Sequence, residues 1–239
     1  MFGPYSNASR RGLAAVMIIE QITLTAFQQH TRVVACERTR RAVCVDPGEA
    51  ADEIEGALER LGLELQAIAL THAHMDHVGG VAALKRARPG AEVVLHEADE
   101  PLYFALPRQP ELLGIPREQW RHLGFEYEPP PPVERRWQDG ETYRVGELRF
   151  KVLHCPGHTP GHVVLFEPNE GKVFVGDCLF AGSVGRTDLP GGSARQLMDS
   201  IHDKILTLGD DVVVYSGHGP ETTIGRERRT NPFLTGRYL

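Results

Sequence analysis

Three histidines and one aspartate fall within seven residues of this chain, which reads Thr71-His72-Ala73-His74-Met75-Asp76-His77. Imidazole is the commonest protein ligand for zinc and iron, and a carboxylate adds an oxygen that neutralises the charge of the ion. Burying these groups together without a cation would be costly. The segment therefore predicts a metal site. Because four ligands complete a single structural zinc and further candidates follow, we expect two metals.

Further candidate ligands lie in three short loops rich in glycine and proline. These are His158 in the segment 154–162, Asp177 in 176–178 and His218 in 216–220. Each loop follows an apolar run typical of a strand, as the first cluster does. Because the carboxyl ends of strands line one edge of an α/β sheet, we expect the four loops to meet in one pocket. Isolated histidines are usually solvated or hydrogen-bonded, and we interpret His30, His122 and His202 in that way.

Composition limits the class of protein. The chain has 239 residues and a net charge of −6, which suits one α/β core and gives no basic stripe for a nucleic-acid backbone. No apolar run reaches the roughly eighteen residues that cross a bilayer. The four cysteines show neither a metal spacing nor the density of a disulfide scaffold. We expect a cytoplasmic protein with a small-molecule partner, and the sequence leaves its oligomeric state open.

The element pattern alternates strands with helices. Strands are predicted over 18–24, 33–36 and 42–45, and an apolar stripe at helical spacing predicts a helix that ends before Gly62. A second helix is expected from Asp76 to just before Pro89, and Ser193 should cap a later one. Prolines interrupt residues 101–141, which form either a simple connector or part of a substrate pocket. Residues 1–16 are interpreted as a flexible extension and residues 17–239 as a single domain.

Several phrases resemble a known family. The metal motif, together with LHCPGHTPGH (153–162), GRTDLP (185–190) and GHGPETTIGRER (217–228), resembles the metallo-β-lactamase superfamily and, more narrowly, its short bacterial glyoxalase II-like hydrolases. The resemblance implies an α/β fold, a four-layer αββα sandwich of mixed sheets with the metal site at the strand-end edge. It also implies hydrolysis of S-2-hydroxyacylglutathione, such as S-D-lactoylglutathione, in methylglyoxal detoxification.

The same resemblance implies how the ligands divide. His72, His74 and His158 would hold the first metal, Asp76, His77 and His218 the second, and Asp177 would bridge both. Two divalent ions about 3.5–4 Å apart can lower the pKa of a shared water toward about 7, which gives a hydroxide that attacks the thioester carbonyl. Asp76 and Asp177 are the candidate catalytic carboxylates. Zinc is favoured, and iron and manganese also suit this ligand set.

The residues that would recognise the thiol carrier are less well defined by the sequence. Larger glyoxalase II enzymes bind glutathione through a helical C-terminal domain, whereas this chain ends at Leu239. Arg186, in the loop after Asp177, is the candidate for a glutathione carboxylate. A basic cluster near the C-terminus is either a second candidate or an ordinary surface (Arg226, Arg228 and Arg229).

Other interpretations stay open at this stage. Cys155 and Cys178 adjoin the ligand loops but are more typical of small packing residues than of nucleophiles. His154 and His162 could orient ligands by hydrogen bonds. A persulfide dioxygenase with one iron resembles the chain around Gly185–Asp188, and a non-catalytic metal-binding module is the remaining alternative.

Overall fold

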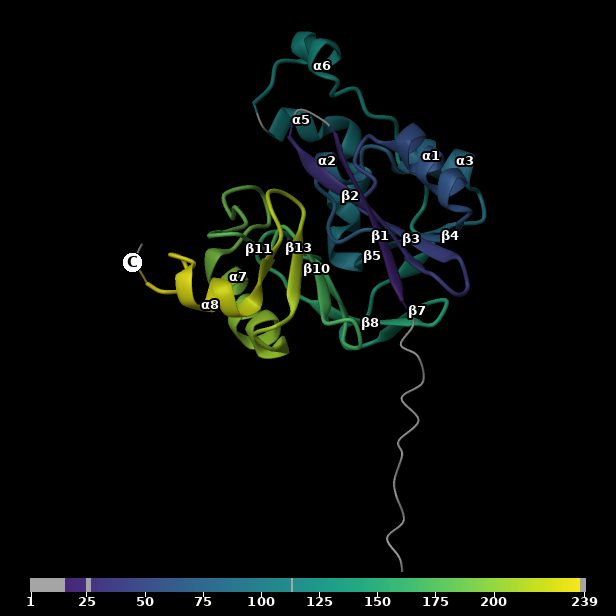
Figure 1. The fold of residues 1–239 in the computed structure, drawn as a ribbon. Helices are drawn as coiled ribbons and strands as arrows, with labels where there is room; N and C mark the ends of the chain where they lie inside the picture. The colour runs from purple at the N-terminus through teal and green to yellow at the C-terminus, as the bar shows by residue number, and fades with distance from the viewer. Residues whose placement is uncertain (1–15, 25–26, 113, 237–239) are drawn as a thin grey trace, which may run out of the picture.

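Two six-stranded sheets dominate the part of the chain that this computed structural model describes, which is residues 16–24, 27–112 and 114–236. The expectation for the N-terminal extension falls almost entirely outside these ranges, since residues 1–15 are not among the described residues. The strand order is β1-β2-β3-β4-β5-β6 in the first sheet and β14-β13-β10-β9-β8-β7 in the second. Helices cover the outer side of each sheet (Figure 1).

The first sheet consists of β1 (Met17–Leu24), β2 (Gln29–Cys36), β3 (Arg41–Val45), β4 (Glu64–Ala69), β5 (Glu92–Leu95) and β6 (Arg135–Arg136). The second consists of β7 (Thr142–Val145), β8 (Leu148–His154), β9 (Val163–Glu167), β10 (Lys172–Gly176), β13 (Val213–Ser216) and β14 (Thr222–Thr223). A separate hairpin pairs β11 (Leu179–Phe180) with β12 (Ser183–Val184). Strands β3 to β6 are parallel neighbours, as are β10 and β13, and the other pairs are antiparallel, so both sheets are mixed.

The helices of the first half are α1 (Ala51–Leu61), α2 (Met75–Val78), α3 (Val81–Ala87), η1 (Glu97–Asp99), α4 (Glu100–Phe104), η2 (Leu106–Arg108), α5 (Gln109–Leu112) and α6 (Arg117–Leu123). Those of the second half are α7 (Ala194–Ser200), the π-helical η3 (Ile201–Ile205), η4 (Leu206–Leu208) and α8 (Ile224–Thr230). Two sequence signals are confirmed: α1 ends at Gly62, which has a left-handed φ of 59°, and the Ser193 hydroxyl accepts the Gln196 N–H at the start of α7.

Three apolar clusters explain the layers. Phe150 and Phe174 of the second sheet pack against residues of the first sheet such as Val34, which forms the core between the two sheets. A second cluster seats α1 and α3 on the outer face of the first sheet, and a third seats α7, η3 and α8 on the outer face of the second. Helix, sheet, sheet and helix therefore stack in order, and the predicted α/β four-layer αββα fold is confirmed.

The helix expected from Asp76 onward differs from the prediction because it is broken in two at Gly79-Gly80. The Gly80 N–H donates to the Gly48 carbonyl, and a Cβ atom on Gly80 would lie 2.7 Å from that oxygen. The turn after β3 therefore presses on the chain between α2 and α3. This close approach ends the first helix after a single turn, α2, which carries the candidate ligands Asp76 and His77.

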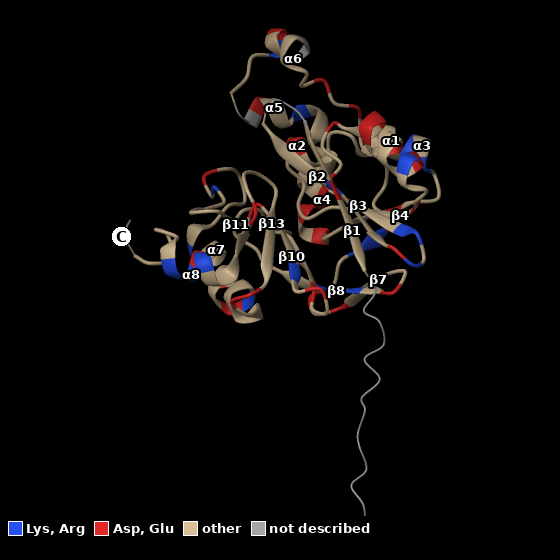
Figure 2. Cartoon of the chain, viewed as in Figure 1, with Lys and Arg blue, Asp and Glu red and all other residues tan. Residues whose placement is uncertain are grey.

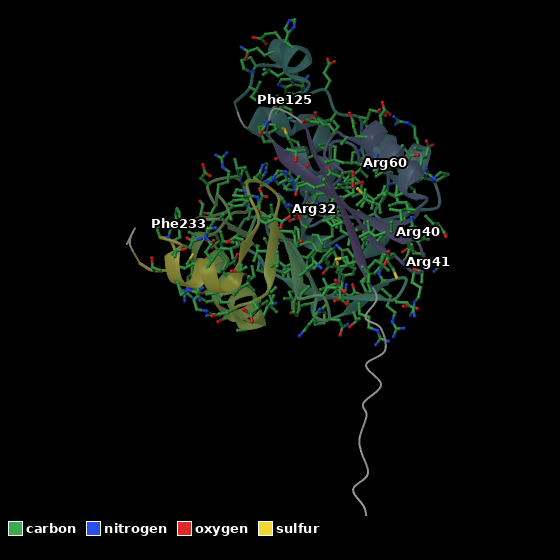
Figure 3. All side chains as sticks on the ribbon, viewed as in Figure 1. Arg32, Arg40, Arg41, Arg60, Phe125 and Phe233 are labelled. Atoms are coloured by element: carbon green, nitrogen blue, oxygen red, sulfur yellow. The ribbon has the colours of Figure 1, made fainter. Side chains whose placement is uncertain are left out.

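Charged residues lie on the outward helices (Figure 2): α1 and α8 carry both signs, whereas the charged residues of α3 are Lys85 and Arg86. One arginine is instead buried: Arg32 of β2, labelled in Figure 3, donates to the Ser216 carbonyl at the end of β13 (2.7 Å) and so joins the first sheet to the loop that carries His218. Among the described residues, every helix is too short or too polar to cross a lipid bilayer.

Candidate metal centre

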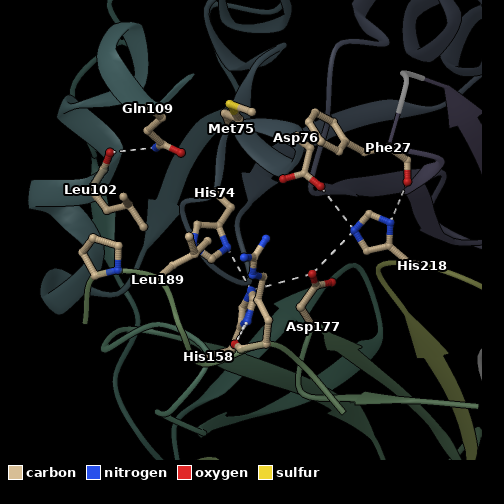
Figure 4. A pocket seen from close by; sticks show the side chains of 12 residues that line it. Phe27, His74, Met75, Asp76, Leu102, Gln109, His158, Asp177, Leu189 and His218 are labelled. Atoms are coloured by element: carbon tan, nitrogen blue, oxygen red, sulfur yellow. Dashed lines mark hydrogen bonds and ion pairs between the residues drawn. The ribbon is translucent and has the colours of Figure 1, made fainter. Parts of the chain in front are cut away.

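The seven predicted ligands converge at the edge where the carboxyl ends of strands from both sheets meet. Figure 4 shows the five of them that line the pocket, which are His74, Asp76, His158, Asp177 and His218. The seven come from four places in the chain: the turn after β4 with the following α2 (His72, His74, Asp76 and His77), the loop after β8 (His158), the residue after β10 (Asp177) and the loop after β13 (His218). This is the convergence that the strand-end rule predicts.

Three imidazoles form a first group. His158 Nε2 lies 2.9 Å from His74 Nδ1 and 3.2 Å from His72 Nε2. The rings of His72 and His158 are buried, and one nitrogen of each of the three rings points at a common centre. Three converging nitrogen donors match three of the four positions of a tetrahedral metal site.

A second group lies beside the first. His218 Nε2 is 3.2 Å from Asp76 Oδ2, and His77 Nε2 is 3.7 Å from the same oxygen. His77 is fully buried, whereas Asp76 and His218 are partly exposed toward the pocket. This set of two imidazoles and one carboxylate suits a harder divalent cation as well as zinc.

Asp177 lies between the two groups. Its Oδ1 is 3.4 Å from His77 Nε2, and its Oδ2 is 3.5 Å from His218 Nε2 and 3.7 Å from His158 Nε2. Gly217 leaves space for this carboxylate, because a Cβ atom there would overlap Oδ1 of Asp177. Oδ1 thus faces the second group, and Oδ2 lies between His218 of the second group and His158 of the first, so this carboxylate is near both groups, as a bridging ligand would be.

Hydrogen bonds on the far side of the rings fix which nitrogen carries the proton. The Nδ1–H of His158 donates to the Arg186 carbonyl (2.8 Å), and the Nδ1–H of His218 donates to the Phe27 carbonyl (3.0 Å). Carbonyl oxygens only accept, so Nδ1 of each ring carries a proton, and Nε2 is the nitrogen that faces the centre and is left to bind a cation. The buried Nε2 of His77 and Oδ1 of Asp177 have no hydrogen-bond partner among the described residues. Ring nitrogens and carboxylate oxygens that face one another across 3.2–3.7 Å fit a bound cation.

Burial sets the charge state of the first group. Burial, and after it the neighbouring imidazole of His158, lowers the pKa of His74 to about 3. Burial and the adjacent imidazoles also hold the pKa of His72 well below its ordinary value. Both rings are therefore neutral at neutral pH, which is the form that binds a metal.

In the second group, the neighbouring carboxylates raise the pKa of a histidine, which is opposite to the shift in the first group. Burial alone would lower the pKa of His77, but Asp177 and Asp76 raise it well above its ordinary value. Burial alone would raise the pKa of Asp177, but His77 beside it lowers that pKa below the usual range. Without a cation, this part of the cluster keeps a proton on His77 to balance the buried carboxylates.

Asp46 is the residue of the centre that sequence reasoning missed. Its Oδ2 accepts from His77 Nδ1 (3.0 Å) and from the Thr71 hydroxyl (2.6 Å), and its Oδ1 accepts from the Thr71 N–H (2.7 Å). The Thr71 hydroxyl in turn lies 3.0 Å from His72 Nδ1. Asp46 is also close enough to His72 and His77 to form a further possible metal-binding group, but its bonds to Thr71 and His77 suit a residue that orients the two histidines. The Asp46-Pro47-Gly48 turn was the only sequence signal.

The cysteines near the cluster belong to a buried packing layer. The Asp177 N–H donates to His162 Nε2 (3.1 Å), and His162 Nδ1 lies 3.3 Å from Cys178 Sγ. The Cys178 thiol donates to the Cys155 carbonyl (3.6 Å), and burial raises its pKa well above the ordinary value. His162 thus supports the backbone of Asp177. His154 Nε2 instead bonds the Pro160 carbonyl (2.8 Å).

A pocket of about 200 Å³ opens onto the cluster. Its walls are His74, Met75, Asp76, His158, Asp177 and His218 at the base, and Phe27, Leu102, Gln109, Arg186, Leu189 and Pro190 around them. Leu102 and Gln109 come from α4 and α5, within the stretch that the sequence left as either a connector or a pocket wall. For this part of the chain, the structure favours the interpretation as a pocket wall over that of a simple connector.

Arg186 lines the same pocket but already has a partner. Its Nε and Nη2 donate to the two carboxylate oxygens of Asp188, each at 2.8 Å, and both side chains are more than half exposed. The C-terminal arginines lie elsewhere: Arg228 and Arg229 pair with Asp210, and neither they nor Arg226 line the pocket.

Comparison with known proteins identifies the family. A sequence model of the metallo-beta-lactamase superfamily matches residues 25–218. Hydroxyacylglutathione hydrolase GloC from Haemophilus influenzae is 39% identical over 224 residues, which cover 92% of this chain and 100% of GloC. The crystal structure of the BLEG-1 B3 metallo-beta-lactamase has a TM-score of 0.79 at 38% identity, covering 92% of this chain and 100% of that one. The structure of TTHA1623 in a di-iron-bound form has a TM-score of 0.76 at 40% identity, covering 90% and 100%.

The chain therefore belongs to the metallo-β-lactamase superfamily, and the family predicted from the sequence is confirmed. Its relatives and its clusters of histidine and aspartate support a metal-dependent hydrolase.

Replacing Asp46 by asparagine should weaken metal binding by about 10-fold to 100-fold, because the carboxylate that orients His77 is lost while the ligands remain. Competition with a chromogenic chelator measures the affinity. Asp210→Asn, which alters an exposed ion pair, is the control and should bind metal like the wild type. Equal affinities in Asp46→Asn and the control would show that Asp46 does not support the centre.

Proposed function

We propose that this protein is a binuclear metal-dependent thioester hydrolase that cleaves S-2-hydroxyacylglutathione, such as S-D-lactoylglutathione, to a 2-hydroxy acid and glutathione. The observation that carries the proposal is the convergence of ring nitrogens of His72, His158, His218 and His77 around the carboxylate of Asp177. The substrate class is supported by the similarity to GloC along its whole length.

In this proposal His72, His74 and His158 would hold one ion, Asp76, His77 and His218 would hold the other, and Asp177 would contribute to both sites. Two bound divalent ions would polarise the thioester carbonyl and make a water acidic enough to attack it at neutral pH. Zinc is the favoured metal, and the di-iron form of TTHA1623 supports iron as an alternative.

The chain's own residues supply orientation and charge. Asp177 and Asp76 both face the pocket, where their oxygens can accept a hydrogen bond from an attacking water and aim it at the carbonyl. The rings of His158 and His218 are fixed by the carbonyls behind them, so their lone pairs need no reorganisation during the reaction. A thiolate is a competent leaving group, so the scheme needs no dedicated general acid.

The pocket suits a small acyl group on a polar carrier. Phe27, Met75 and Leu102 offer apolar walls beside the centre, and Arg186 stands at the same pocket with a guanidinium that can bind a carboxylate. A glutathione carboxylate would have to replace Asp188 on Arg186. The four cysteines are buried and form no disulfide, which agrees with the reducing cytoplasm that we propose as its location.

Two other functions were left open by the sequence. A persulfide dioxygenase with a single iron would have no use for the second group, whereas Asp76 and His218 lie close together in this structure with His77 beside them. A non-catalytic metal-binding module would not need a pocket that opens onto the ligands. Both observations favour hydrolysis at a two-ion centre.

The reaction type can be tested with a panel of substrates, with and without oxygen. S-D-lactoylglutathione should be hydrolysed equally fast in both conditions, and Cys155→Ala and Cys178→Ala should keep the rate within about threefold, because neither thiol faces the pocket. Glutathione persulfide is the comparison substrate, and a chromogenic cephalosporin is included because BLEG-1 is a B3 metallo-beta-lactamase. Strict dependence on oxygen, or faster turnover of the cephalosporin, would contradict the proposal.

Arg186→Ala should raise KM for glutathione thioesters by roughly 10-fold and change kcat much less, because a contact to a remote carboxylate acts equally in the ground and transition states. Asp188→Asn is the matched variant and should lower KM, since it removes the competing carboxylate. An N-acetylcysteamine thioester, which lacks the carboxylates of glutathione, should respond to neither change. Equal losses on both kinds of thioester would remove Arg186 from the carrier site.

A further inference from the structure

A buried aspartate behind the first group of imidazoles has no place in the function described so far. Asp99 is the last residue of η1, in the segment 97–112 that forms one wall of the pocket, and its side chain is completely buried. It does not line the pocket and makes no hydrogen bond to any of the seven candidate ligand side chains among the described residues.

The carboxylate of Asp99 joins two ligand loops that come from different sheets. Its Oδ2 accepts from the Ala73 N–H (3.1 Å) and from the Thr159 hydroxyl (2.7 Å), and its Oδ1 accepts from the Gly161 N–H (2.6 Å). Ala73 separates His72 from His74, and Thr159 directly follows His158. One side chain is therefore bonded next to all three imidazoles of the first group.

The same wall segment holds the other side of the Ala73 peptide. Gln109 Nε2 donates to the Ala73 carbonyl (2.7 Å) and to the Leu102 carbonyl (2.9 Å). With Asp99 on the N–H and Gln109 on the carbonyl, both polar backbone groups between His72 and His74 are satisfied by residues 97–112. The second group of ligands receives no such bond from Asp99.

The space around Asp99 is closely filled. A Cβ atom on Gly161 would lie 2.6 Å from the Asp99 backbone nitrogen and 2.8 Å from its Cβ, so this loop can approach only because residue 161 is glycine. A carboxylate in such a site cannot move without moving a ligand loop. The spacing between the loop after β4 and the loop after β8 thus depends on where Asp99 sits.

We propose that Asp99 is a positioning residue that sets the geometry of the first metal site, His72, His74 and His158, and leaves the second site largely unaffected. The proposal rests on the two-ion centre proposed above. Asparagine cannot replace it, because its single acceptor oxygen would face either Gly161 or the pair Ala73 and Thr159. In either orientation its NH₂ group would meet a backbone N–H, which leaves one buried donor without a partner.

The test is titration of the metal-free full-length protein with ¹¹³Cd²⁺, followed by cadmium NMR and by chelator competition. Two resonances are expected, and the variants His74→Ala and His218→Ala assign them to the first and second sites. In Asp99→Asn, cadmium affinity should fall by about 10-fold or more at the first site and by less than about threefold at the second. Asp139→Asn is the control, since Asp139 also accepts a backbone N–H, that of His154 at the end of β8, but bonds no residue next to a candidate ligand, and both of its affinities should equal those of the wild type.

Three results would count against the proposal or its basis. Equal weakening of both sites, or of neither, in Asp99→Asn would overturn the positioning role. If that variant does not fold, Thr159→Val removes only one of the three bonds and should still weaken the first site selectively, by a smaller factor; no selectivity there would overturn the role as well. A wild type that shows a single cadmium resonance would instead overturn the two-ion centre.

Discussion

Nitrogen lone pairs that face one another in a buried space are the constraint on which the rest of this structure depends. The Nε2 atoms of His72 and His158 lie 3.2 Å apart. On the other side of the His158 ring, the Nδ1–H donates a hydrogen bond to the Arg186 carbonyl. Two such acceptors repel each other, and burial removes the water that could mediate between them. A cation at their centre relieves the repulsion, which is why the arrangement of ligands argues for metal binding more strongly than any single residue does.

The fold supplies this constraint from both of its sheets. The first sheet brings His72 and His74 through β4, and the second brings His158, Asp177 and His218 through β8, β10 and β13. The apolar core between the sheets, which includes Phe174, keeps these strand ends facing each other. Hydrogen bonds at the edge of the sheets, such as that from Arg32 to the Ser216 carbonyl, then hold individual loops in position. The cluster is thus a product of packing between sheets and belongs to neither sheet alone.

Local pattern was sufficient for part of this account. The stripe of α1, the Ser193 cap and the strand exits that carry the ligands could be predicted because they depend on neighbouring residues and on a general property of strand ends. The role of Asp46 could not, since it depends on β3 lying beside β4. The break at Gly80 arises from contact with Gly48, more than thirty residues earlier in the chain. Partners distant in the sequence decide these features.

The central claim is that two ions occupy this centre in the active protein, and an anomalous-scattering crystal structure combined with elemental analysis of fully active protein tests it most directly. The account predicts two transition-metal ions per chain, one among His72, His74 and His158 and one among Asp76, His77 and His218, with Asp177 in contact with both. Fully active protein with only one ion per chain, or with its ions bound away from these side chains, would contradict it.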